Sequence, residues 1–240
     1  MSIFDHETLA CPKCGREIDF AVARSVLADR RPDLREQIMA GTFQIDRCPH
    51  CETRLRREPD LNYVDIGRAQ WILARPAPEV VDWGALEAQA LGIYELAYGS
   101  LAPAPAQEIG RGMQVRVVFG WPALCEKVLA LEHGIDDVSL ECMKVRLMRD
   151  LNGPALGDTT ELRLHRVEDE GLILAWVDAD GEAPLEVLTV PRALLDSIDG
   201  ARADHGELRA SLLAGPFVDI NRLLIDPMDA PARQPEPVAA

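Results

Sequence analysis

Several features that would assign the chain to a common class of protein are missing from its 240 residues. No segment approaches the ~18 to 20 consecutive apolar residues that a membrane-spanning helix needs, so we expect no integral membrane protein. The first seven residues are acidic and lack an apolar stretch, so we expect no signal peptide and a cytoplasmic location. The motifs GxGxxG, GxxxxGK(S/T), GxSxG and HExxH are also absent. The sequence therefore offers no residues for a catalytic mechanism and favours a non-enzymatic protein.

Lysine is scarce as well, because 22 of the 25 basic residues are Arg. This usage indicates a GC-rich genome, and we expect a bacterial source. Acidic residues are in excess and give a formal net charge of -15. The whole excess follows residue 76, since residues 1–76 are neutral overall. Such a charge repels nucleic acid at long range and favours a basic protein as partner.

Cysteines carry the clearest positive signal. Cys11 and Cys14 lie in the segment CPKC, and Cys48 and Cys51 lie in CPHC. A CxxC turn directs two thiolates at one ion, and two such turns supply the four thiolates of a tetrahedral metal site. The two pairs are separated by 33 residues, whereas zinc ribbons commonly separate them by about 15 to 20. An inserted helix would account for the difference.

Zinc is the metal that this set of ligands favours. A site closed by four thiolates leaves no position for water, so we expect it to be structural and to supply much of the folding free energy of the surrounding unit. Iron is the alternative, because four cysteines also hold the iron of rubredoxin-like electron carriers. Gly15 suits the positive φ expected after the first pair, whereas Glu52 at the same place after the second pair predicts slight strain.

The pattern of apolar residues predicts an α+β protein. Residues 1–76 are expected to form a small zinc-ribbon-like antiparallel sheet with a helix inserted between Pro32 and Gly41, closed by a strand over residues 71–74. Residues 77–112 predict a helix from about Asp82 and then an extended Pro/Ala-rich linker. Residues 113–226 predict an acidic α+β unit with one strand, two helices and three antiparallel strands. The tail 227–240 contains four prolines and is expected to be disordered.

Other candidate residues have simpler interpretations. Arg54, Arg56 and Arg57 follow the second cysteine pair and can form an interaction surface for phosphate, as in nucleic-acid-associated zinc ribbons. The acidic residues nearby and the net charge favour a solvated face instead. Cys125 and Cys142 lie on two consecutive predicted helices without activating neighbours, so we interpret them as small buried apolar residues.

The chain resembles the CpXC-domain family, which takes its name from two CPxC motifs and has no established activity. The resemblance implies four metal-ligating cysteines but no function, and it covers roughly residues 1–150. Glu52, where glycine is commoner, is the clearest departure. The residues that carry the resemblance are CPKCG (11–15), Asp19-Phe20, Met39–Thr42, Phe43 before CPHC (48–51), Asn62–Asp65, Trp71–Leu73, Arg116–Phe119, Glu126-Lys127, Gly134–Asp137 and Met143-Lys144.

These observations favour a zinc-binding protein in which the four-cysteine site stabilises a protein-interaction module. Two alternatives stay open, a rubredoxin-like iron electron carrier and a nucleic-acid-associated zinc-ribbon factor. A small-molecule ligand is neither indicated nor excluded by the sequence.

Overall fold

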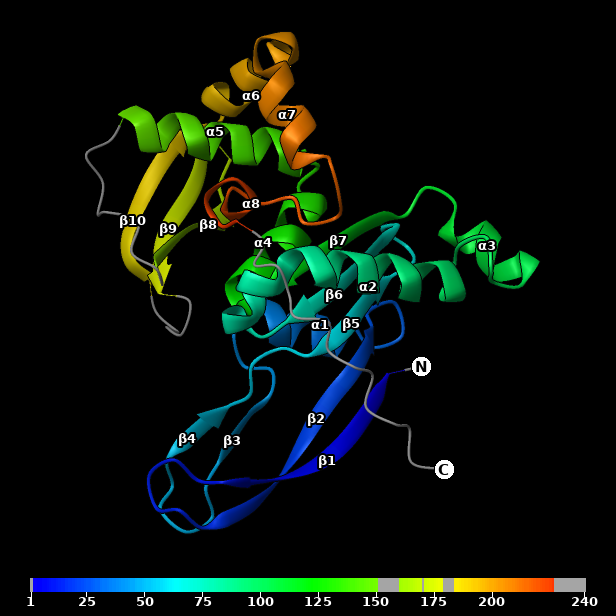
Figure 1. Cartoon of the computed structure of the whole chain (residues 1–240). Coiled ribbons are helices and arrows are strands. Elements are labelled where there is room, and N and C mark those ends of the chain that lie inside the picture. The colour runs from blue at the N-terminus through cyan, green and yellow to red at the C-terminus, as the bar shows by residue number, and fades with distance from the viewer. Residues whose placement is uncertain (1, 151–159, 170, 179–183, 227–240) are drawn as a thin grey trace.

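The computed structural model describes residues 2–150, 160–169, 171–178 and 184–226 (Figure 1). The tail 227–240, expected to be disordered, lies outside these residues. Within them the chain combines sheets with packed helices, so the predicted α+β class is confirmed. The strands are β1 (Ile3–Ala10), β2 (Glu17–Leu27), β3 (Ile45–Arg47), β4 (Arg54–Arg56), β5 (Leu61–Asp65), β6 (Gln70–Arg75), β7 (Gln114–Phe119), β8 (Thr160–Val167), β9 (Gly171–Asp178) and β10 (Pro184–Pro191). The helices are α1 (Pro32–Met39), α2 (Trp83–Ala97), α3 (Ala104–Gly110), α4 (Gly120–Glu132), α5 (Asp137–Asp150), α6 (Arg192–Gly200), α7 (Gly206–Leu212) and α8 (Asn221–Leu224), with 3-10 turns at Ala77–Asp82 and Arg202–His205.

The main sheet has the strand order β1-β2-β5-β6-β7. It is mixed, because β2 pairs with β5 and β6 pairs with β7 in parallel, whereas the other neighbours are antiparallel. Helices cover both of its faces: α1 and α4 pack on one side and α2 on the other. Trp71 and Leu73 face α2, while Ile72 and Ala74 face α1 and α4. This explains the unbroken apolar run of β6, which is typical of a strand buried on both faces.

Strand β6 does not close the first unit, contrary to the expectation for residues 71–74. It hydrogen-bonds to β7 over Gln70–Arg75 and Gln114–Phe119. The boundaries expected after residue 76 and before residue 113 therefore do not coincide with a break in the sheet. The physical reason is burial: an apolar strand needs cover on both faces, and here α2 and α4 from the later part of the chain supply it.

The Pro/Ala-rich segment after α2 is a helix, and the prediction of an extended linker there is wrong. Helix α3 begins directly after Pro103, and Pro105 lies in its first turn. A proline is tolerated at this place, since the first N–H groups of a helix have no partner within the helix. The predicted helix at Pro32 is present as α1, and Gly41 follows it with a φ of +66° and an N–H bonded to the carbonyl of Ile38.

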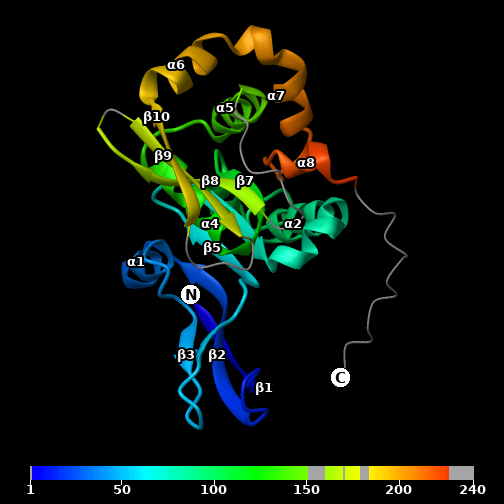
Figure 2. The same cartoon turned by 90° about the vertical axis from the view of Figure 1, so that its left-hand side faces the viewer.

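The second sheet has the order β10-β9-β8 and is antiparallel. Its strands are the three antiparallel strands that the sequence predicts. One of its faces packs on α5, α6 and α7 around Leu172, Leu174 and Trp176. Helix α4 contacts both the main sheet and β8. It thus joins two halves of the molecule, as the views in Figures 1 and 2 show. One half is the main sheet with α1, α2 and α4, and the other is the second sheet with α5, α6 and α7.

Two hairpins project from the main sheet on the side away from the second sheet (Figures 1 and 2). One consists of β1 and the first part of β2, and the other is the β3–β4 pair. We call them together the arm. The strand β1 is absent from the sequence predictions, because most of its residues are exposed and it has no buried face to show a period. In the described residues, no helix has the length and apolar character needed to cross a membrane.

Candidate metal centre

The four cysteines of the CPxC motifs lie at the tip of the arm, one pair in each hairpin turn. The two turns have the same backbone geometry. The carbonyl of the first cysteine accepts a hydrogen bond from the N–H four residues later, Gly15 to Cys11 and Glu52 to Cys48, each at 2.8 Å. Each turn thereby holds its two thiols on one side. Below each turn an antiparallel strand pair, β1–β2 or β3–β4, completes the hairpin.

The sulfur atoms converge as a tetrahedral site requires. The Sγ atoms of Cys11 and Cys51 are 3.6 Å apart, and those of Cys14 and Cys48 are 3.7 Å apart. All four lie within 4.8 Å of one another. A zinc–sulfur bond of about 2.3 Å implies an edge of about 3.8 Å in a regular tetrahedron, so the set fits a metal ion. The sulfur distances are too long for disulfides, and the thiols are free.

Little apolar packing supports this tip. Cys11 and Cys48 are buried and pack with Ile18 and Leu55, whereas Cys14 is exposed. So small a cluster contributes few kcal/mol of hydrophobic free energy. A bound ion would therefore be the main cross-link between the two turns.

Hydrogen bonding favours the metal-binding form of one thiol. The Sγ of Cys51 lies 3.3 Å from the hydroxyl of Thr53. The side chain and the backbone N–H of Thr53 lower the pKa of Cys51 to about 6. Since the thiolate is the ligand form, this shift favours metal binding by Cys51.

Each CPxC turn is called a knuckle below, and the residue that follows each knuckle has the positive φ that the sequence predicts. Gly15 has a φ of +71° and Glu52 a φ of +58°. A residue with a Cβ is disfavoured in this left-handed region, so the second turn stores strain that the first does not.

The three arginines after the second knuckle have different surroundings. Arg57 forms a salt bridge with Glu7 of β1, at 2.6 Å. The Arg56 guanidinium stacks over the ring of Trp121 in α4, with Cζ 5.0 Å from the ring centroid. Arg54 is exposed on the arm. Arg56 and Arg57 of this candidate surface thus contact other side chains of the molecule.

The remaining cysteines lie in separate parts of the interior. Cys142 is 1% exposed and packs in the core of the second sheet. Cys125 packs beside the core under α1, where its thiol lies 3.3 Å from the carbonyl of Ile38. Burial raises the pKa of Cys125 to about 11, so it stays a neutral thiol.

A second group of potential ligands escaped the sequence analysis. Carboxylate oxygens of Glu126, Glu141 and Asp219 lie within 4.8 Å of one another in the interior. However, the Lys144 ammonium already lies between them, 2.6 Å from Glu126 and 2.9 Å from Glu141, and the Arg163 guanidinium pairs with Glu126 and Asp219. The group is a buried salt-bridge cluster whose cations take the place of a metal. The available signal was that two of the chain's three lysines lie within apolar helical segments.

Comparison with known families agrees with this geometry. A family model described as CpXC protein matches residues 9–144, which is more than half of the chain. The matched part includes both cysteine turns, strands β2, β5, β6 and β7 of the main sheet, and the helices α1, α2 and α4 packed on it. No curated protein and no solved structure gives a significant match. With its two CPxC turns at the tip of the arm, the chain belongs to the CpXC family.

Proposed function

We propose that the four cysteines hold one zinc ion with a structural role, and that the molecule is a protein-interaction module stabilised by this ion. The observation that carries the proposal is the convergence of four thiols at the end of two hairpins that have little apolar core of their own. Four thiolate ligands complete the tetrahedral shell of zinc and leave no position for a substrate or water. A closed site of this kind supports structure and not catalysis.

Two surface features support the interaction part of the proposal. Helix α2 and the segments that follow it expose large apolar side chains: Leu91 (45% exposed), Leu96 (65%), Leu101 (69%) and Ile109 (43%). Large apolar side chains that are exposed to water are candidates for a protein contact. The excess negative charge after residue 76 favours a partner with a basic surface, mainly through the association rate and specificity.

The metal part is tested by elemental analysis and an absorption spectrum of the full chain purified without chelators. We expect about one zinc per chain and no visible colour. Iron with visible charge-transfer absorption would replace the proposal with the electron-carrier hypothesis. Absence of any metal would refute it.

A matched pair of cysteine variants tests the ligand assignment. Cys11 is 2% exposed and Cys142 is 1% exposed, so both changes to Ser bury a hydroxyl of the same size. Cys11→Ser should lower the zinc content at least about tenfold and lower the thermal midpoint of unfolding, because a ligand is lost. Cys142→Ser should keep one zinc per chain. Equal zinc content in the two variants would contradict the assignment.

The interaction part is tested by cross-linking in the native host, followed by binding measurements on the captured partner. Leu96→Asp combined with Leu101→Asp should weaken binding at least about tenfold, since burying two carboxylates in an apolar contact is costly. Increasing the salt concentration should slow association with a basic partner. An unchanged affinity of the double variant, or the lack of any specific cross-linked partner, would contradict the proposal.

A further inference from the structure

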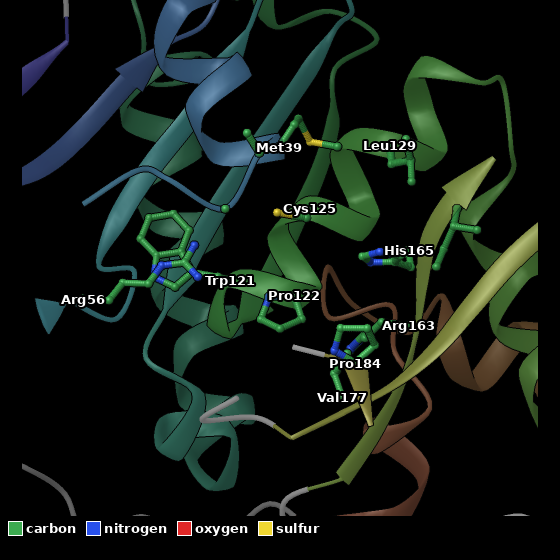
Figure 3. Close-up of a pocket in the computed structure, with 13 residues that line it drawn as sticks. Met39, Arg56, Trp121, Pro122, Cys125, Leu129, Arg163, His165, Val177 and Pro184 are labelled. Atoms are coloured by element: carbon green, nitrogen blue, oxygen red, sulfur yellow. The ribbon is translucent and has the colours of Figure 1, made fainter. Parts of the chain in front are cut away.

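A partly open cavity of about 190 Å³ lies between the two halves of the molecule (Figure 3). One side is formed by helix α4 and the end of α1, and the opposite side by the face of the second sheet that turns away from α5 and α6. The strand β4 of the arm contributes Arg56 at the edge. Three segments far apart in the sequence thus meet at one hollow. Its volume exceeds the about 150 Å³ of a protein cavity that accommodates a benzene ring.

The walls are mainly apolar. Met39, Pro122, Leu129 and Val177 contribute hydrocarbon surface, and the neutral thiol of Cys125 adds a polarizable one. Binding sites for small molecules commonly combine such walls with a few polar groups that fix the orientation of the ligand.

Nitrogen-bearing side chains supply the polar part. Arg56 and His165 line opposite sides of the cavity (Figure 3). None of the described lining residues is acidic, although the chain contains 40 Asp and Glu residues. The Arg163 guanidinium also lines the cavity, but its charge is already matched by Glu161 and Asp219. The guanidinium available to a ligand is therefore that of Arg56, with His165 opposite; the Glu58 carboxylate acts on Arg56 electrostatically but does not line the cavity.

The Arg56 guanidinium is held in place and incompletely hydrogen-bonded. It lies over the ring of Trp121, whose Nε1 donates a 2.8 Å hydrogen bond to the carbonyl of Arg57 and so fixes the ring. The buried Nε of Arg56 has no hydrogen-bond partner among the described residues. An unpaired buried donor is costly, and an acceptor that reaches it recovers this free energy. A planar carboxylate matches the fork of a guanidinium through two parallel hydrogen bonds.

We propose that this cavity is a binding site for a small organic carboxylate whose apolar body is about the size of one ring. The carboxylate pairs with Arg56, and the body lies between Pro122, Leu129 and Val177. One available guanidinium matches a monoanion, and the limited volume excludes large ligands. This site is independent of the metal and of the interaction surface on α2.

Benzoate is the probe for this proposal, and benzyl alcohol is its uncharged analogue. The zinc-loaded full chain is titrated at constant ionic strength and followed by the indole N–H signal of Trp121 in two-dimensional NMR. For a ligand this small we expect a dissociation constant on the order of 1 mM. Benzyl alcohol should bind at least about tenfold more weakly, since it cannot form the charged pair. Absence of a saturable shift with benzoate, or equal affinity for the two probes, would overturn the proposal.

Variants separate the cavity from general anion binding. Arg56→Gln should weaken benzoate binding at least about tenfold, whereas Arg54→Gln, on the same strand but outside the cavity, should leave it unchanged. Leu129→Trp fills the cavity without touching the charge and should also abolish binding. Retained affinity in both Arg56→Gln and Leu129→Trp would place any bound benzoate elsewhere and refute the assignment. Phenyl phosphate bound more tightly than benzoate would likewise contradict a carboxylate site.

Discussion

At the scale of single residues, the two knuckles differ mainly at the position after the second cysteine. Gly15 and Glu52 have nearly the same backbone conformation and make the same hydrogen bond, but only glycine takes this conformation without strain. The turn with Glu52 therefore exists because the thiol geometry and the β3–β4 pairing hold it there.

This difference predicts opposite effects of two substitutions. Glu52→Gly should stabilise the protein by about 1 kcal/mol, because it removes the left-handed strain. Gly15→Ala should destabilise it by about 1 kcal/mol for the same reason. A Cβ at Gly15 meets no atom within 4 Å, so the second effect is one of backbone conformation and not of a clash. Urea unfolding measures both. Changes of the same sign would contradict the strain argument.

The grouping of the four cysteines could be predicted from the sequence because the information for it is local. Each CPxC turn specifies its own geometry through residues that are neighbours in the chain, and the convergence of two turns needs only flanking strands. The cavity and the buried cluster could not be predicted in this way. Arg56, Trp121 and His165 meet through long-range packing, and nothing next to them in sequence records it.

At the scale of elements, the pattern of apolar residues predicted strands with a buried face, such as β2 and β6, and missed the exposed strand β1. Ile18, Phe20 and Val22 alternate with exposed residues, and this part of β2 lies where the sequence places it. The exposed strand β1 gives no such period. The parallel pairing of β6 with β7 was also missed, because an apolar run indicates burial but not the neighbouring strand.

The elements α4, α5 and β8 meet at the buried salt-bridge cluster, where Glu126 (α4), Glu141 and Lys144 (α5), Arg163 (β8) and Asp219 come together. Replacing one charge in such a cluster leaves an opposite charge buried without its partner. Lys144→Met should accordingly destabilise the protein by about 3–5 kcal/mol. The same change at the exposed Lys13 should alter the stability by less than about 0.5 kcal/mol. Thermal unfolding of the two variants checks this; a small effect at Lys144 would show that the cluster contributes little.

The cluster also predicts a pH dependence. Burial raises the pKa of Glu141 to about 7 from its usual 4.5, although Lys144 and Lys127 oppose this shift and Asp219 and Glu126 add to it. The folded state then binds this proton more strongly than the unfolded state. The contribution of Glu141 to stability is thus largest at low pH and falls as the pH rises from about 4.5 to about 7.

Two Gln variants of this cluster measure that slope. Glu141→Gln should remove a decrease of up to about 1.4 kcal/mol per pH unit from the stability profile between pH 5 and 7. Glu126 is the matched control. Burial acts to raise the pKa of Glu126, but the charges of Lys144 and Arg163 outweigh it, so the pKa lies below its usual value. The stability that ionised Glu126 contributes is therefore lost only at more acidic pH. Glu126→Gln should therefore leave the slope between pH 5 and 7 as in the wild type. Identical profiles for Glu141→Gln and the wild type would contradict the assignment.

At the scale of the whole molecule, residues 215–220 connect the two halves. The N–H of Phe217 bonds to Glu87 of α2 at 2.7 Å, and the carbonyl of Val218 accepts a 2.6 Å hydrogen bond from Lys127 of α4. Asp219 then pairs with Arg163 of β8. This short segment therefore satisfies buried polar groups from both sheets and their helices, which no sequence pattern could indicate.

The side chain of Phe217 tests the importance of this segment. It is 2% exposed and packs edge-on against Phe119 with ring centroids 5.0 Å apart. Phe217→Ala should destabilise the protein by about 3–5 kcal/mol through the cavity it leaves. Leu224→Ala, at a side chain 57% exposed, should change the stability by less than about 0.5 kcal/mol. Thermal unfolding distinguishes the two. Similar midpoints for both variants would mean that the segment is only loosely held.

The place of this segment near the end of the chain also bears on protein synthesis. Glu87, Lys127 and Arg163 leave the ribosome before residues 215–220, and until then part of their hydrogen-bonding capacity has no native partner. Lys127 and Arg163 also pair with carboxylates that are made earlier, Asp137 and Glu161, whereas Glu87 gains its cation, Arg222, only after this segment. A buried charge without its partner is strongly unfavourable. The cysteine turns have no such requirement, because all four thiols are made within the first 51 residues. The four thiols can therefore come together before the chain is complete, whereas the burial of Glu87 has to wait for the last described segment.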